Sequence, residues 1–154
     1  MKFRDFVNDD IALYSVWLNK DYVKKWYGAP EDWLCEVSSD EYNWINHFIV
    51  EYDNKSIGFC QYYEYVKGGE TWHGDIQIEG TYSIDYVIGE EDYLGKGLGR
   101  KIIVNLTNMI FEQTNAQRVI VQPDDDNHAS NNTLLSAGYK YDKKNKLFIY
   151  EKVN

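Results

Sequence analysis

The chain has 154 residues and a formal net charge of −9, and its aromatic content is high, with five Trp and fourteen Tyr. That length forms one domain with a sizeable core and leaves no room for a second, so we expect a single domain over residues 1–154. The aromatic content excludes a disordered chain, the acidity argues against a nucleic-acid partner, and no apolar run approaches a membrane span.

Cysteine and histidine usage indicates a reducing compartment and no metal. Cys35 and Cys60 are isolated in the sequence and are predicted to be buried free thiols. Nothing at the N-terminus resembles a signal peptide, so we expect a cytoplasmic protein. The three histidines, His47, His73 and His128, are scattered along the chain, and we expect no metal site.

The N-terminal part of the chain predicts a strand, two short helices and a hairpin. Asn8 or Asp9 is the expected cap of the first helix, and Gly28 and Pro30 end the second. The expected elements, in order, are a strand over Lys2–Val7, helices up to Leu18 and over Tyr22–Tyr27, a helix or loop over Asp32–Asn46, and strands over His47–Tyr52 and Ile57–Tyr63 joined by a turn at Asp53–Ser56.

The C-terminal part predicts two strand–helix units and a closing hairpin. After a polar loop over Lys67–Gly80, the expected elements are a strand over Tyr82–Ile88, a helix over Arg100–Gln113, a strand over Arg118–Gln122, a helix over Asn127–Ala137 ended by Gly138, and a hairpin of Tyr139–Tyr141 and Leu147–Glu151. This order predicts an α/β (α+β) domain with a mixed, mostly antiparallel central sheet flanked by helices. The two strand–helix units would lie side by side, with a ligand between the carboxyl ends of their strands.

The segment Leu94–Arg100, Leu-Gly-Lys-Gly-Leu-Gly-Arg, lies where the first of these strands turns into a helix. Glycine lets backbone N–H groups approach a ligand closely, and a helix N-terminus adds partial positive charge. Lys96, Arg100 and Lys101 add formal positive charge at the same place in an otherwise acidic chain. The segment therefore predicts a turn that binds a pyrophosphate.

Two other phosphate motifs do not fit this turn. A P-loop requires Gly-Lys followed by Ser or Thr, and here Gly97 follows Lys96. A dinucleotide fingerprint requires a third glycine three residues after the second, and that place holds Ile102 or Arg100, depending on which glycines form the first pair. A glycine-rich turn that only joins strand to helix stays open as the plain alternative.

Several blocks of the chain together resemble a known family. Leu94–Gly99, Asn127 and Ala137–Tyr139 are similar to the GNAT superfamily of acyl-CoA N-acyltransferases. Further blocks resemble the aminoglycoside 6′-N-acetyltransferases within it, namely Trp17–Asn19, Trp26–Gly28, Ile57–Tyr62, Ile84–Asp85 and Ile88–Tyr93. The resemblance runs from about Trp17 to Tyr139, and it implies the GNAT fold with acetyl-CoA as the acetyl donor and no metal.

The resemblance also implies roles for individual residues. The coenzyme A residues would be Tyr86, Val87 and Ile88, whose backbone pairs with the pantetheine arm, Leu94, Gly95, Lys96, Gly97, Leu98, Gly99 and Arg100 at the pyrophosphate, and Asn127 beside the arm. Asp85 would be the catalytic carboxylate that receives or orients the substrate amine. Glu70 would be a second acidic residue for the substrate, and Trp26 and Tyr27 would form a wall for its sugar rings.

The chemistry agrees with a carboxylate at position 85. Acetyl transfer needs a neutral amine, a stabilised oxyanion and a departing thiolate, and a carboxylate can accept the proton of an ammonium group. A backbone N–H near Val87 would meet the oxyanion. Leu134, however, occupies the position where the superfamily usually has a tyrosine that protonates the thiolate, so we expect a working but slower enzyme, with water or Thr133 as a partial substitute.

The identity of the acceptor is the weaker inference. The leading hypothesis is a small cationic amine, an aminoglycoside acetylated at its 6′-amine in a ternary complex, which suits the acidic charge and the acidic and aromatic residues Glu70, Asp75, Glu79, Asp85, Asp124–Asp126, Trp26, Tyr27 and Trp72. Solubility alone also explains the acidity, and Asp85, Asp124–Asp126, Trp72 and Trp26 each have a plain structural alternative. Another amine (a polyamine, a peptide N-terminus or a siderophore precursor) and a catalytically silent acyl-CoA-binding module both stay open, as does the choice between monomer and homodimer.

Overall fold

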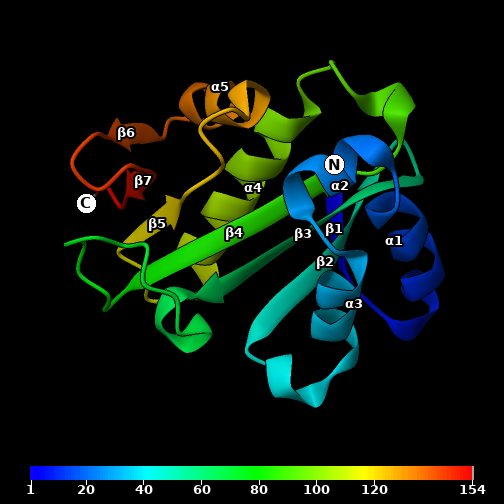
Figure 1. Cartoon of the computed structure of the whole chain (residues 1–154), viewed down its shortest axis with the longest axis horizontal. Helices are drawn as coiled ribbons and strands as arrows, with labels where there is room; N and C mark the ends of the chain where they lie inside the picture. The colour runs from blue at the N-terminus through cyan, green and yellow to red at the C-terminus, as the bar shows by residue number, and fades with distance from the viewer. Residues whose placement is uncertain (154) are drawn as a thin grey trace.

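A seven-stranded sheet forms the centre of the computed structural model, which describes residues 1–153 (Figure 1). The strand order is β1-β2-β3-β4-β5-β7-β6, and the pairings are antiparallel except between β4 and β5. The strands are β1 (Lys2–Asp5), β2 (Ile45–Tyr52), β3 (Lys55–Glu64), β4 (Thr81–Ile88), β5 (Arg118–Val121), β6 (Lys140–Asp142) and β7 (Leu147–Glu151). The mixed, mostly antiparallel sheet predicted from the sequence is confirmed.

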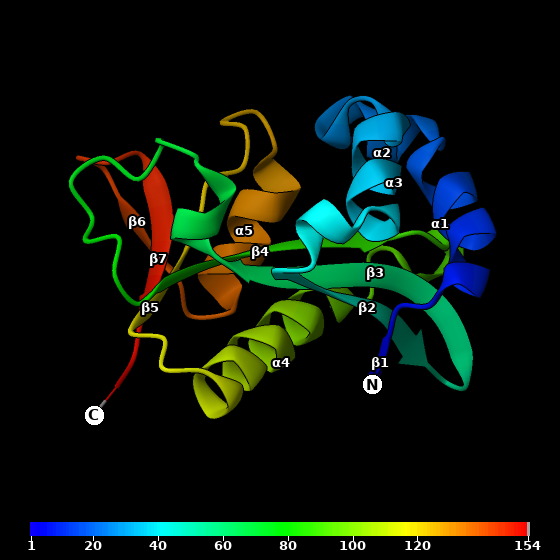
Figure 2. The ribbon, with the colours of Figure 1, turned by 90° about the horizontal axis from the view of Figure 1, so that it is seen from below.

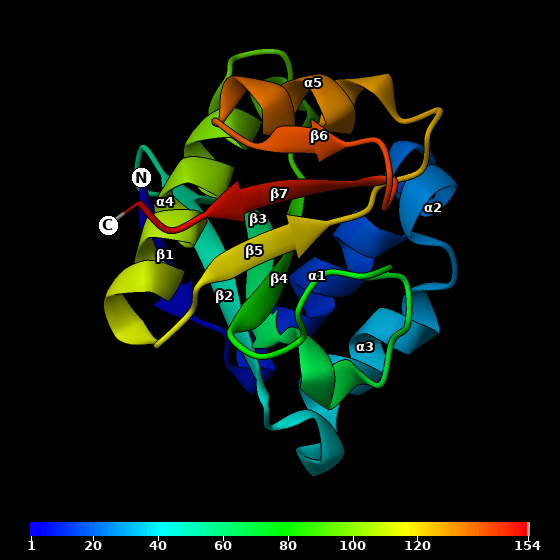
Figure 3. The same cartoon turned by 90° about the vertical axis from the view of Figure 1, so that its left-hand side faces the viewer.

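Helices cover both faces of this sheet (Figure 2). The α-helices are α1 (Ile11–Leu18), α2 (Asp21–Tyr27), α3 (Pro30–Ser38), α4 (Leu98–Gln113) and α5 (His128–Ser136), and short 3₁₀ turns lie at 8–10, 40–42, 65–68 and 91–93. Helices α1 to α3 lie over one face and α4 over the other. Figure 3 shows β5, β7 and β6 side by side, with α5 next to β6.

Alternating side chains along the strands supply a core to each helical layer. Trp17 and Tyr14 of α1 pack with Ile49, Phe59 and Val87, which face α1 to α3. The neighbouring positions in the strands face the other way and pack against α4, and this second core includes Val50, Cys60, Ile84, Ile102, Leu106 and Ile110. A strand with helices on both faces carries apolar residues at odd and even positions alike, which explains the continuous apolar run of β3.

The ambiguous segment Asp32–Asn46 is a helix in its first part. Gly28, with φ of 73°, ends α2, and Pro30 begins α3 at a position where its missing N–H costs no hydrogen bond. Trp33, Leu34 and Val37 pack on the α1 core. Cys35 falls between these contacts and is exposed, so the expectation of a buried thiol is wrong there; Cys60 is buried and free as predicted.

The start of α1 also differs from the prediction. Neither Asn8 nor Asp9 caps the helix; the residue before it is Asp10, whose carboxylate accepts hydrogen bonds from the N–H of Val7 at 2.8 Å and from Arg4 at 2.7 and 2.8 Å. The ion pair with Arg4 ties this turn to β1, which holds Asp10 in place more firmly than a cap alone.

The parallel pair β4–β5 separates soon after it forms. The two strands pair only at Thr81–Arg118 and Tyr82–Val119. At the next position the Ser83 hydroxyl donates a hydrogen bond to the Ile120 carbonyl at 2.7 Å, in place of a further backbone bond. Within residues 1–153, the rest of β4 has no strand neighbour on this side. The carboxyl ends of the two strands therefore open into a wedge, as the predicted position of the ligand requires.

No helix among residues 1–153 combines the length and the apolar character needed to cross a membrane.

Candidate active site

Two adjoining cavities fill the wedge between β4 and β5. The large cavity, of about 540 Å³, extends along β4 to the N-terminus of α4. The small cavity, of about 210 Å³, lies between β4 and the loop before it. The residues that line both cavities are Trp26, Tyr27, Tyr86, Asn127 and Ser130. A ligand in one cavity would therefore meet a ligand in the other.

The glycine turn forms one end of the large cavity. Gly95 and Gly97 both have φ of 73°, and a Cβ at either position would meet nothing within 4 Å, so the backbone conformation and not space is what requires glycine. Gly97 is the N-cap of α4, and the first backbone bond of the helix runs from Lys101 N to Gly97 O at 3.4 Å. The N–H groups of residues 98–100 thus point out of the helix end, which is the arrangement that binds phosphate.

The charged side chains of this turn have different positions. Arg100 lines the large cavity, and its Nε donates a hydrogen bond to the Ser136 carbonyl at 3.0 Å. The Lys96 ammonium instead lies 5.6 Å from the ring centre of Tyr93, and Lys96 is not among the residues that line the cavity. Its backbone still lies between the two glycines.

The open edge of β4 forms the floor of the large cavity. The Tyr27 hydroxyl donates a hydrogen bond to the Tyr86 carbonyl, and the Tyr22 hydroxyl donates one to the Ile88 carbonyl at 2.6 Å. The N–H and C=O of one strand residue point to the same side, so the amides of Tyr86 and Ile88 also face this edge. The backbone carbonyl of Val87 points the other way, toward Gly58 of β3. The amides at this edge are therefore those of the two neighbours of Val87.

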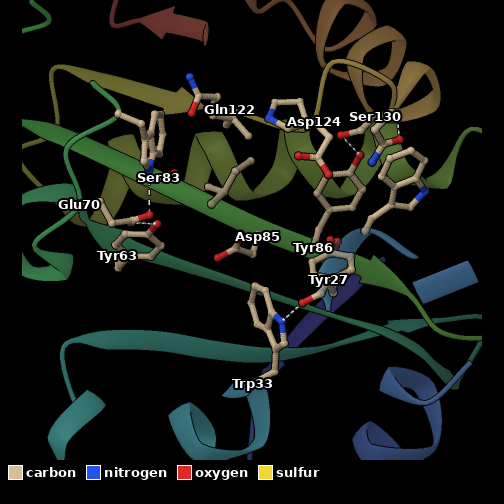
Figure 4. Close-up of a pocket in the computed structure, with 16 residues that line it drawn as sticks. Tyr27, Trp33, Tyr63, Glu70, Ser83, Asp85, Tyr86, Gln122, Asp124 and Ser130 are labelled. Carbon is tan, nitrogen blue, oxygen red and sulfur yellow. Dashed lines mark hydrogen bonds between the residues drawn. The ribbon is translucent and has the colours of Figure 1, made fainter. Parts of the chain in front are cut away.

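Aromatic and acidic side chains line the small cavity (Figure 4). Its aromatic residues are Trp26, Tyr27, Trp33, Tyr63, Trp72 and Tyr86, and its acidic residues are Glu70, Asp85 and Asp124. Both oxygens of Glu70 are held: Oε1 accepts a hydrogen bond from Tyr63 at 2.7 Å, and Oε2 accepts one from Trp72 at 2.8 Å. The Trp33 indole donates to the Tyr27 carbonyl at 2.8 Å and fixes the opposite wall. Flat rings and carboxylates are the groups that bind a cation.

Asp85 projects from β4 into this cavity (Figure 4). Gln61 Nε2 donates a hydrogen bond to Asp85 Oδ2 at 2.8 Å. Burial raises the pKa of Asp85 to about 7, and the charges of Glu36 and Glu70 act in the same direction, while the Gln61 hydrogen bond opposes them. A carboxyl group that titrates near neutrality can accept a proton and release it again.

Two hydroxyl groups lie where the cavities meet. The Tyr86 hydroxyl is 3.3 Å from Ser130 Oγ, and both residues line both cavities. Asn127 also lines both, and its Oδ1 accepts a hydrogen bond from the Ser130 N–H at 3.2 Å, which caps α5. Leu134 is fully buried in the core beside α4 and lines neither cavity.

Most of the residues singled out from the sequence are thus brought together around one wedge, but Asp75, Glu79, Asp125 and Asp126, also considered for the acceptor, line neither cavity. Those expected at the acceptor, Trp26, Tyr27, Glu70 and Asp85, line the small cavity, and those expected at coenzyme A, Lys96 apart, line the large one. Their individual roles stay predictions. Sequence reasoning gave no indication of Trp33, which lies in the ambiguous segment, or of Tyr63 and Gln61, which looked like ordinary strand residues. A Gln within an apolar strand is the one signal that could have indicated Gln61. Among residues 1–153 no cluster of three His, Cys, Asp or Glu side chains has metal-binding geometry.

Comparison with known proteins identifies the family. Residues 7–147 match the acetyltransferase (GNAT) domain. The chain belongs to the GNAT acetyltransferase family. An aminoglycoside N(6′)-acetyltransferase type 1 of Klebsiella pneumoniae is 24% identical over 141 residues, which are 85% of this chain and 69% of the relative. An N-hydroxyputrescine acetyltransferase of Acinetobacter baumannii is 26% identical over 121 residues, 75% of this chain and 56% of the relative.

A solved structure shares the fold of this GNAT chain. The aminoglycoside acetyltransferase AAC(6′)-Ib, crystallised with coenzyme A and kanamycin, superposes with a TM-score of 0.85 at 20% identity, over 98% of this chain and 94% of the other. The GNAT fold that the sequence resemblance implied is confirmed.

Proposed function

We propose that this GNAT protein transfers the acetyl group of acetyl-CoA to the 6′-amine of an aminoglycoside. The observation that carries the proposal is the position of Asp85, a carboxyl group with pKa of about 7 at the wall of an aromatic and acidic cavity that adjoins a phosphate-binding helix end. The relatives that act on aminoglycosides and the kanamycin complex support the choice of acceptor.

The large cavity fits the acetyl donor. The outward N–H groups at the start of α4 would hold the pyrophosphate, and the open edge of β4 would pair with the pantetheine arm, which carries amide groups of its own. The cavity is long enough to connect these two regions, since its lining runs from Tyr86 on β4 to Arg100 on α4.

The small cavity fits a polycationic acceptor. Asp85 and Glu70 stand on its walls, and Asp124 adds a third carboxylate from the loop after β5. The ring faces of Trp26 and Trp33 would lie against the C–H faces of the sugar rings, while the carboxylates would hold ammonium groups. The same features supply no contact specific to an apolar acceptor.

The reaction needs one base and one acid. The ammonium group gives a proton to ionised Asp85, and the neutral nitrogen attacks the thioester carbonyl, so that the C–N bond forms and the C–S bond breaks. The amide of Tyr86 or Ile88 stabilises the oxyanion. The coenzyme A thiolate then takes a proton from the Tyr86 hydroxyl, 3.3 Å from Ser130 Oγ, which is the group we assign to this step in place of the buried Leu134. The acetylated nitrogen gives up its remaining surplus proton through water, which restores the Tyr86 hydroxyl.

Thiol release tests the proposal directly. The protein is mixed with acetyl-CoA and either kanamycin, a diamine of the putrescine type or no acceptor, and free thiol is measured over time with Asp85→Asn as the matched control. We expect release with kanamycin, lost in the variant, and a product acetylated at the 6′-nitrogen by NMR. Release only with the diamine would identify the other amine class, and coenzyme A binding without any release would identify a silent binding module.

A further inference from the structure

Three polar side chains form a row across the centre of the sheet. His47 on β2 lies directly opposite Gln61 on β3, and Gln61 lies directly opposite Asp85 on β4. Residues in register on adjacent strands project from the same face, so the three side chains meet on the face covered by α1 to α3. His47 and Gln61 are not needed to shape either cavity, and neither lines one.

Hydrogen bonds join the row from end to end. His47 Nδ1 is 2.9 Å from Gln61 Oε1, and Gln61 Nε2 is 2.8 Å from Asp85 Oδ2. Gln61 is only 1% exposed, so water cannot replace either bond. A buried amide that loses a hydrogen-bond partner destabilises the fold, so both the NH₂ group and the oxygen of Gln61 must keep a partner.

An ionised Asp85 fixes the orientation of the Gln61 amide, and a protonated Asp85 also permits the reverse orientation. An ionised carboxylate only accepts hydrogen bonds, so the NH₂ group faces Asp85, the oxygen faces His47, and His47 Nδ1 must carry a proton. A protonated Asp85 can donate to the amide oxygen. In the arrangement that uses this donor, the amide is rotated, its NH₂ group faces His47, and Nδ1 must be without a proton.

We propose that Gln61 is a positioning residue that couples the protonation of Asp85 to the tautomer of His47. While Asp85 is ionised, His47 locks the amide so that Oδ2 is held and Oδ1 is left to meet the acceptor amine. When Asp85 takes the proton, the amide rotates and the neutral ring moves its own proton from Nδ1 to Nε2. The assignment of Asp85 as the proton acceptor rests on the proposed function; the coupling itself does not.

The surroundings of the row place both titrations in the right order. Burial lowers the pKa of His47, while its hydrogen bonds with Gln61 and with the backbone of Glu36 act in the opposite direction, and Asp85 titrates near 7. The His47 ring packs against the aromatic rings of Phe6 and Phe59, and it donates a further hydrogen bond to the backbone of Glu36. The titratable groups that face Asp85 are Glu36 on α3, Glu70 before β4, Tyr63 on β3, Tyr27 on α2 and Tyr14 on α1.

Glu36 is the neighbour that most directly affects the row. Its Oε1 is buried without a hydrogen-bond partner among residues 1–153; burial raises the pKa of this carboxyl group, and a hydrogen bond with Gln61 opposes that rise. Removal of its charge lowers the pKa of Asp85, because a like charge nearby disfavours ionisation. The tautomer change of His47 must then move to lower pH together with the Asp85 titration.

Nitrogen NMR of the histidine rings tests the coupling without any turnover. The chain has three histidines, so the His47 signals are assigned by comparison with His47→Asn. The Asp85 midpoint is read from its carboxyl carbon. We expect the His47 Nδ1 signal to change from protonated to unprotonated as the pH falls through that midpoint, and both changes to shift together in Glu36→Gln. A His47 ring that responds only to its own protonation, at lower pH, overturns the proposal.

Kinetic variants supply a second readout. Gln61→Met keeps the size of the side chain but removes the hydrogen bond to ionised Asp85, and we expect the midpoint of kcat/KM against pH to rise by about 1 to 2 units. Activity at pH 7 then falls roughly 5- to 50-fold, while the KM for acetyl-CoA is unchanged. His47→Asn retains a group that donates or accepts at the Nδ1 position and is expected to rescue the profile that His47→Phe alters. An unchanged midpoint in Gln61→Met contradicts the proposal. An absence of acetyl transfer refutes the proposed function and leaves the NMR result to decide the coupling.

Discussion

Replacement of Asp85 by Asn should stabilise the fold and abolish its activity. The folded protein holds the proton of Asp85 more tightly than the unfolded chain does, since burial raises the pKa from 3.8 to about 7. Ionisation of this group therefore opposes folding. The wild type loses stability as the pH rises from about 4 to about 7, and the neutral Asn does not.

The size of the effect follows from the pKa difference. Each pKa unit corresponds to about 1.4 kcal/mol, so a rise of about three units makes Asp85→Asn more stable than the wild type by at most about 4 kcal/mol above pH 7. The Asn oxygen can still accept the hydrogen bond from Gln61. For a chain of this length, that gain raises the Tm by roughly 10 °C. Loss of the base lowers kcat by about 10²- to 10⁴-fold.

Asp10→Asn is the control with the opposite sign. The Arg4 hydrogen bond lowers the pKa of Asp10, so the stability it contributes is present above pH 3.8 and is lost as the pH falls below it. Asp10→Asn should therefore be less stable than the wild type at pH 8, by about 1.5 to 3 kcal/mol. This difference should shrink in strong acid.

Urea unfolding at a series of pH values between 4 and 8.5 measures both differences. The gain of Asp85→Asn must grow across the window between 4 and 7 and become flat above it. A gain that is the same at pH 4.5 and pH 8 would show that folding does not raise the pKa of Asp85. A variant less stable than the wild type at pH 8 would refute the reasoning, because it would mean that the carboxylate is well solvated in the folded protein.

Three further predictions concern the two cavities. Gly97→Ala places a Cβ at φ of 73°, which costs about 1 to 2 kcal/mol of stability and misdirects the amides at the start of α4. Calorimetry should therefore show weaker coenzyme A binding. The control Gly69→Ala, with φ of 67°, should lower the Tm similarly and leave coenzyme A binding intact. Glu70→Gln should raise the KM for the amine roughly 10-fold and leave that for acetyl-CoA unchanged, and equal effects on both would place Glu70 outside the acceptor site. Tyr86→Phe should lower kcat by up to about 10²-fold with little change in KM, and an unchanged kcat would mean that water protonates the thiolate.

The long periodic elements and the glycine turn were predictable because their signals are local. Helix α4 repeats apolar residues on one face through Ile102, Leu106 and Ile110, and its start is fixed by glycines with positive φ. Asp85 was predictable because an acid within an apolar strand is unusual and because its neighbours resemble a family motif. Each of these signals is contained within about ten residues of sequence.

The parts that could not be predicted depend on which strands are neighbours. Gln61 and His47 became part of the site only through the register that places them in line with Asp85. Trp33 belongs to the site because α3 packs across the sheet, although its segment has mixed composition. Leu134 is the opposite case. The GNAT resemblance places it where a tyrosine usually protonates the thiolate, but its side chain lies in the core.

The geometry of one strand explains why the proposed reaction takes place where β4 leaves β5. Side chains alternate along a strand, so Asp85 faces the layer of α1 to α3 while Tyr86 faces α4 and α5, and the backbone edge opens between them. In the proposed reaction, the base can then reach the amine, the acid can reach the sulfur, and the amide can reach the carbonyl oxygen, each from a different direction. Continued pairing with β5 would close this edge. The hydrogen bond from Ser83 to Ile120 marks the last point at which the two strands are held together.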